Sequence, residues 1–155
     1  MDILNYDFES ALEAGFKTLF DAAGLALRVA DDADEGELPD ERITLEIDSG
    51  GPISDEHLNA ERVYDNYAGT IAVEIHTPRV ANDQTATSGN FRSRHRELVA
   101  TVRKTLEEMP QSVLDANWPD ALSPTKITPT GTDRENDKDS QMTTLNYAMQ
   151  FRIKA

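Results

Sequence analysis

The spacing of apolar residues along the chain predicts helices and strands in alternation. Near the start, apolar residues recur every three or four positions, which places them on one face of a helix. They are Phe8, Leu12, Phe16, Leu19 and Phe20. Asp7 is a suitable N-cap for this helix, and Gly24 stands where a left-handed residue commonly ends one.

Alternation of apolar and polar residues predicts strands in much of the remaining chain. Residues 25–29 predict a short strand, and residues 43–48 and 67–76 predict longer ones. The signal is weak at 126–131, where it rests on a single isoleucine. It is strongest at 145–154, where the alternation is sustained over the whole segment.

A second main helix is predicted from Ser93 to Met109, and Pro110 ends it. Its buried face consists of Leu98, Val102, Leu106 and Met109. The element order is then helix, strands, helix, strands, without an internal repeat. This order predicts a single α+β domain over residues 1–155, with an antiparallel or mixed β-sheet flanked by two main helices.

Four predicted connections are long for a chain of this size: 30–41, 49–66, 78–92 and 131–142. Structureless connections beyond about 12 residues are uncommon in compact domains and are usually functional or disordered. The second of them begins with the turn sequence Ser-Gly-Gly-Pro. Because no obvious active site accompanies these loops, their functional interpretation is contact with a large partner.

The charge balance is strongly acidic, with 15 Lys and Arg against 29 Asp and Glu and a net charge of −14. Such a chain is not expected to bind nucleic-acid phosphates over a broad face, nor to bind membranes through a basic surface.

The absence of cysteine excludes disulfides, thiolate metal sites and cysteine nucleophiles. No apolar run approaches the ~18 residues of a membrane span, and no signal peptide is expected. Hydrophobic residues make up 38%, which predicts a modest core and suits burial against partner subunits.

The chain carries none of the compact catalytic signatures that a sequence can reveal. It has no Gly-x-Ser-x-Gly elbow, no phosphate-binding loop and no dinucleotide-binding glycine pattern. Glu74 and His76 are two residues apart on a predicted strand, so they share a face and could ligate a metal. Two ligands do not make a site, and the simpler interpretation is a polar pair facing solvent. We therefore expect no enzymatic activity, no cofactor and no metal centre.

Positive charge is concentrated in the second predicted helix, where five of the fifteen Lys and Arg residues fall within thirteen positions. We call this set the basic ridge: Arg92, Arg94, Arg96, Arg103 and Lys104. One interpretation is local: the helix dipole stabilises cations near the C-terminus of the helix, and charged side chains keep its surface soluble. The other is that the ridge docks an acidic loop of a neighbouring copy, with complementary charge setting register and encounter rate.

A complementary acidic segment, residues 31–41, lies between the first two predicted strands. Its candidate interface carboxylates are Asp31, Asp32, Asp34, Glu35 and Glu37. Clustered like charges repel one another and cannot be buried without partners, so this segment is expected to be a solvated loop. The residues themselves leave both interpretations of the basic ridge open.

Four segments and the arginine-rich helix resemble the tail terminator (tail-completion) proteins of long-tailed bacteriophages, a group that includes lambda minor tail protein U, and related neck proteins. The segments are NYDFESAL (residues 5–12), ERITLE (41–46), YAGTIAVEI (67–75) and NYAMQFRI (146–153). The resemblance spans nearly the whole chain and lies in its size, the order of its elements and the character of the quoted segments.

The resemblance implies a small α+β domain with a sheet and two flanking helices. It implies a structural virion protein, assembled in the host cytoplasm, that forms a ring of copies of itself, typically hexameric, at the head-proximal end of the tail tube. Such a ring ends tube polymerisation, contacts the tail tube protein and the head connector, and lets DNA pass through its lumen without specific binding. Two alternatives stay open: another phage neck, head-completion or tail protein, and an acidic monomeric binding module that mimics nucleic acid.

Overall fold

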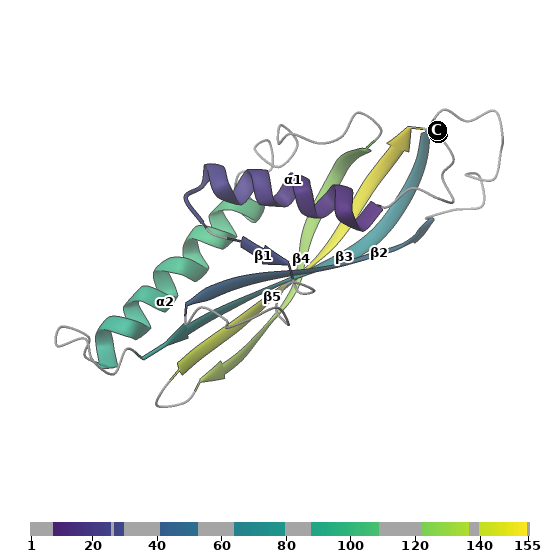
Figure 1. Cartoon of the computed structure of the whole chain (residues 1–155). Coiled ribbons are helices and arrows are strands. Elements are labelled where there is room, and N and C mark those ends of the chain that lie inside the picture. Colours follow the sequence, from purple (N-terminus) through teal and green to yellow (C-terminus); the bar gives the residue numbers. More distant parts are fainter. Residues whose placement is uncertain are drawn as a thin grey trace.

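A computed structural model of the chain shows a five-stranded β-sheet with both helices on one side of it (Figure 1). The structure describes residues 8–25, 27–29, 41–52, 64–79, 88–108, 122–136 and 140–154. In chain order the elements are α1 (Phe8–Ala22), β1 (Leu27–Val29), β2 (Arg42–Pro52), β3 (Tyr64–Pro78), α2 (Ser88–Arg103), the π-helical turn η4 (Lys104–Glu108), β4 (Leu122–Asn136) and β5 (Ser140–Lys154).

The strands follow the order β1-β2-β3-β5-β4 across the sheet. β1 runs parallel to β2, and all other neighbouring strands are antiparallel, so the sheet is mixed. β4, paired with β5, forms one edge, and the three-residue β1 forms the other. The predicted fold class, an α+β domain with a mixed sheet and two main helices, is confirmed.

The first helix ends in a left-handed glycine, as its sequence predicts. Gly24 has a φ of 78°, a conformation that glycine adopts without the steric cost of a Cβ. The N–H of Leu25 donates to the carbonyl of Phe20 at 2.9 Å. The N–H of Gly24 donates to the carbonyl of Asp21 at 3.1 Å, which completes a Schellman cap. This turn brings Leu25 into the core and directs the chain toward β1.

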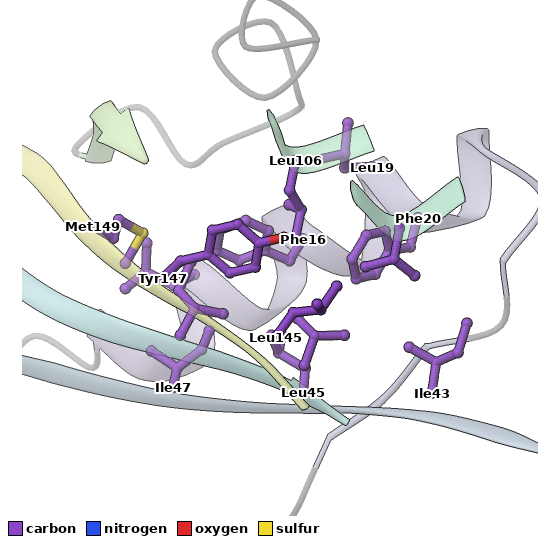
Figure 2. Packing of buried hydrophobic residues seen from close by; sticks show 14 of the residues in the cluster. Phe16, Leu19, Phe20, Ile43, Leu45, Ile47, Leu106, Leu145, Tyr147 and Met149 are labelled. Atoms are coloured by element: carbon purple, nitrogen blue, oxygen red, sulfur yellow. The ribbon is translucent and has the colours of Figure 1, made fainter. Parts of the chain in front are cut away.

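The apolar stripes of both helices and the alternating residues of three strands form one core (Figure 2). The helical part consists of Leu12, Phe16, Leu19 and Phe20 of α1, and of Leu98, Val102 and Leu106 of α2 and η4. The strands contribute Ile43, Leu45, Ile47, Tyr67, Ile71, Val73, Ile75, Leu145, Tyr147, Met149 and Phe151. Because side chains alternate between the two faces of a strand, these positions define the helix-covered face of the sheet.

β2 and β3 extend further than their alternation predicts. Residues 49–52, expected to be a turn, continue β2, with a register shift between Asp48 and Gly51. Proline has no N–H to donate to a neighbouring strand. Pro52 is tolerated in β2 because β1 pairs only with residues 43–45, so no hydrogen bond to β1 is lost at Pro52. β3 already begins at Tyr64, so the loop expected at 49–66 is wrong at both of its ends.

The loop predicted at 131–142 is wrong, because most of it is strand. β4 continues to Asn136 and β5 begins at Ser140, with Arg134 paired to Thr143. Residues 128–136 are all exposed at this edge of the sheet, so they are mostly polar and show no apolar alternation. Register shifts after Pro124 and Pro129 interrupt the pattern further.

The arginine-rich helix begins earlier and ends differently from its prediction. α2 starts at Ser88, five residues before the predicted start, so the loop expected at 78–92 is also too long. After Arg103 the chain continues as η4, and Leu106 of this turn packs into the core. The acidic loop expected at 30–41 lies outside the described residues except for its last one.

Candidate functional site

Helical spacing divides the basic ridge between different sides of α2. Arg92, Arg96 and Arg103 are separated by four and seven residues, so they follow one stripe of the helix. Arg94 lies on another stripe, and Lys104 falls in η4, exposed to solvent. The five cations therefore do not form one continuous surface.

The arginines of the first stripe line a groove of about 500 Å³ between α2 and the paired strands β4 and β5. Arg134 of β4 lines the groove as well. We call this site the arginine groove and define it by Arg92, Arg96, Arg103 and Arg134. Four arginines line it, and its volume is typical of ligand-binding sites.

Arg134 reaches the groove because of the register between β4 and β5. It pairs with Thr143, whose side chain is buried on the helix-covered face, so Arg134 lies on that face as well. Sequence reasoning missed this residue because it assigned 131–142 to a loop. No signal in the sequence marks it, since an exposed edge strand rich in polar residues has the composition of a loop.

His95 is a buried residue of the groove wall that ties α2 to two strands. Its Nδ1 lies 2.9 Å from Thr77 Oγ1 on β3, and its Nε2 lies 2.7 Å from Thr143 Oγ1 on β5. A neutral imidazole has one donor and one acceptor nitrogen, so one hydroxyl accepts from the ring and the other donates to it. Burial lowers the pKa of His95, and the neighbouring His76 and Arg134 lower it further. The ring is therefore neutral at pH 7 and fixes the position of the helix on the sheet.

Within the described residues, the groove arginines form no ion pair with a carboxylate. Arg103 Nη2 donates to Thr132 Oγ1 at 3.0 Å. Its Nε is buried and has no hydrogen-bond partner in the described part of the chain. A buried donor without an acceptor costs about 1–3 kcal/mol. Within the same residues, no carboxylate forms an ion pair with Arg92, Arg96 or Arg134.

Arg94, by contrast, is neutralised within the chain. Its Nε and Nη2 donate to the two carboxylate oxygens of Glu41 at 3.3 and 3.0 Å, and its Nη1 lies 3.9 Å from Glu97. The hydrogen bond to Glu41 raises the pKa of Arg94. This contact joins α2 to the beginning of β2, which β3 and β5 separate from β4. Arg94 is thus turned away from the arginine groove.

The remaining candidates of the sequence lie elsewhere. Glu74 and His76 share the helix-free face of β3, as their spacing predicts, since Val73 and Ile75 between and beside them are buried on the other face. Among the described residues, no group of three His, Cys, Asp or Glu side chains could hold a metal ion. The acidic half of the predicted interface lies outside the described residues, namely Asp31, Asp32, Asp34, Glu35 and Glu37.

Comparison with known proteins supports the fold without assigning a family. No protein-family model and no curated protein matches the chain. A chain from the virion of a native gene transfer agent particle aligns over 100% of both chains, with 11% identity and a TM-score of 0.49. A second solved protein, with no function in its name, is 14% identical and has a TM-score of 0.52 over 95% of this chain and 96% of its own. This second likeness shows a shared fold, and a fold by itself does not assign a function.

No helix in the described part of the chain is long and apolar enough to cross a bilayer.

Proposed function

We propose that this chain is a structural protein of a phage-like virion, a tail terminator that forms a ring on the head-proximal end of the tail tube. In this role the ring ends tube polymerisation and joins the tail to the head connector. The proposal starts from the sequence resemblance, which covers nearly the whole chain. It is supported by the fold, because a sheet with two helices is the architecture that the resemblance implies.

The observation that carries the proposal is the arginine groove. The chain has a net charge of −14, yet four arginines line this groove, and none of them forms an ion pair within the described residues. Opposite charges on different surfaces of one molecule favour contact between unlike surfaces of successive copies. A head-to-tail contact of this kind closes into a ring when the rotation between copies is right.

The groove suits binding rather than bond-making. Arginine stays protonated at physiological pH, so its guanidinium does not serve as a general base. His95 is buried, and threonine hydroxyls engage both of its ring nitrogens. The proposed function is therefore structural, without catalysis and without a cofactor.

The acidic balance of the chain also suits a ring through which DNA passes. A negative surface repels phosphates, so DNA slides through the lumen without specific binding. The partners of this role are copies of the chain itself, the tail tube protein and the head connector, and its location is the tail or neck of the virion.

The direct test adds the purified chain to polymerising tail tubes of its own particle and images them by electron microscopy. We expect ring-shaped caps at one end of the tubes and a halt in elongation. Tubes that elongate unchanged and without caps would contradict the proposal. Rings bound to the head connector, with bare tubes, would instead identify another neck protein.

A further inference from the structure

The arginine groove has the chemistry of a site for an anion that several guanidiniums bind at once. Arg92, Arg96 and Arg103 approach it from α2, and Arg134 approaches it from β4. Planar guanidiniums recognise carboxylates through paired N–H donors, with more geometric specificity than a point charge. In the described residues, Arg103 Nε is a buried donor that still lacks an acceptor. A carboxylate brought into the groove would find donors from both elements.

We propose that the groove receives the acidic segment of a neighbouring copy as the contact between successive copies in the ring. The carboxylates are those of Asp31, Asp32, Asp34, Glu35 and Glu37, five acids within seven positions. They bind the four groove guanidiniums through charge-assisted hydrogen bonds. This inference rests on the proposed function and names the surfaces by which the copies meet.

The other stripe of α2 already shows this chemistry inside the chain. Glu41, the last residue of the acidic segment, places its two oxygens 3.0 and 3.3 Å from nitrogens of the Arg94 guanidinium. Arg94 is one cation on an exposed side of the helix. The arginine groove is lined by four arginines, beside a buried histidine that holds the helix in place.

The topology separates the two ends of the acidic segment from the groove. The acidic segment joins Val29 of β1 to the start of β2, and these two strands are at the edge of the sheet opposite β4. Three strand spacings, about 14 Å, separate β2 from β4. α2 stands between them, because Arg94 contacts Glu41 on one side and Arg96 lines the groove on the other. Glu41, where the segment ends, is thus held on one side of α2 and the groove lies on the other, which suits contact between unlike surfaces of two copies.

A nucleic acid is a less suitable occupant of the groove. Binding to a duplex needs cations spread along a face, and the net charge of −14 opposes it. The groove instead concentrates four cations around about 500 Å³, a volume suited to a few side chains.

Charge-swap complementation in the full-length chain tests the contact. The groove variant combines Arg96→Glu with Arg134→Glu, two exposed positions whose replacement leaves the core intact. The segment variant combines Asp32→Lys with Asp34→Lys. Each variant alone places like charges at the proposed contact. Mixed together, the reversed groove of one meets the reversed segment of the other.

The matched control combines Lys17→Glu with Lys126→Glu. It makes the same change of net charge as the groove variant, at two exposed positions outside the groove. Circular dichroism and thermal unfolding establish that every variant is folded. Sedimentation velocity then measures assembly as a function of concentration.

We expect the groove and segment variants alone to need more than about tenfold higher concentration than the wild type to assemble. An equimolar mixture of the two should assemble near the wild-type concentration, and so should the control. If both variants assemble like the wild type, the groove contact is overturned, whereas the proposed function fails separately when assembled rings leave tail tubes uncapped. Binding of labelled duplex DNA by the wild type, and its loss in the groove variant, would assign the groove to nucleic acid and overturn the inference.

Discussion

Two regions on the helix-covered side of the same sheet differ in nearly every property. In the first, Phe16, Leu106 and Tyr147 belong to an apolar core beneath α1 and η4 (Figure 2). The second is the arginine groove, between α2 and the β4 edge. The core is buried within the chain, whereas the groove keeps one buried donor, Arg103 Nε, that finds no acceptor among the described residues. The contrast separates what makes this chain fold from what it offers to a partner.

The difference arises from what lies opposite each stripe of α2. Leu98 and Val102 pack into the core that β3 and β5 supply. Arg96 and Arg103 face the groove that β4 borders, and β4 is an exposed and largely polar edge strand there. One helix thus anchors the fold through its apolar stripe and presents cations through the next stripe.

A cavity in the core has the largest expected effect on stability. Phe16 is fully buried, and Phe16→Ala removes a ring whose space the neighbouring residues fill only in part. We expect the free energy of unfolding, measured by urea denaturation, to fall by about 3–5 kcal/mol. Phe16→Leu keeps most of the volume and should lose less. A loss below about 1 kcal/mol for the alanine variant would contradict the assigned core.

A smaller effect is expected at the polar border of the core. The Tyr147 hydroxyl donates to Glu107 Oε1 at 3.3 Å. Burial raises the pKa of Tyr147 and the Glu107 charge raises it further, so the phenol stays a donor at neutral pH. Tyr147→Phe should lower the free energy of unfolding by about 1–2 kcal/mol. Glu107→Gln retains an acceptor and should cost less, and the reverse order of the two losses would argue against this hydrogen bond.

Acidification should weaken the attachment of α2 through His95. Because the pKa of His95 is lowered in the folded chain, the unfolded chain binds the proton more readily. The contribution of the neutral ring is therefore fully present above the unfolded value of about 6.5 and is lost as the pH falls below it. Urea denaturation from about pH 7 to about pH 5 should show a steeper decline for the wild type than for His95→Gln. Parallel declines would contradict a buried neutral histidine.

The smallest change in stability is expected at the exposed ion pair. The side chains of Arg94 and Glu41 are 50% and 41% exposed, and exposed pairs contribute about 0.2–1 kcal/mol. Arg94→Gln should lower the free energy of unfolding within that range and leave self-association unchanged. Arg96→Glu should do the opposite, with unchanged stability and weaker self-association in sedimentation velocity. If Arg94→Gln weakens self-association more than Arg96→Glu does, the division of α2 into two stripes is contradicted.

The core could be predicted from the sequence because periodicity reports burial. The stripe of α1 with its Gly24 cap, and the inward positions of β2, β3 and β5, follow directly from spacings of about 3.6 and 2 residues. The same spacing placed Arg92 and Arg96 together, which the groove confirms.

The groove itself could not be predicted, because it depends on pairing between distant residues. Arg134 enters it through its register with Thr143 across the β4 and β5 ladder, which local composition does not encode. His95 is held by threonines 18 and 48 residues away. Arg94 is not part of the groove, because it forms an ion pair with Glu41, 53 residues earlier.

The central claim is that copies of this chain meet head to tail and close into a ring. Analytical ultracentrifugation of the wild type over rising concentration tests it most directly, with a parallel series that contains tail tubes. Closure predicts one discrete, ring-sized species, in solution at high concentration or on the tubes. A monomer at every concentration that tail tubes leave unchanged, or an open-ended ladder of sizes, would contradict the claim.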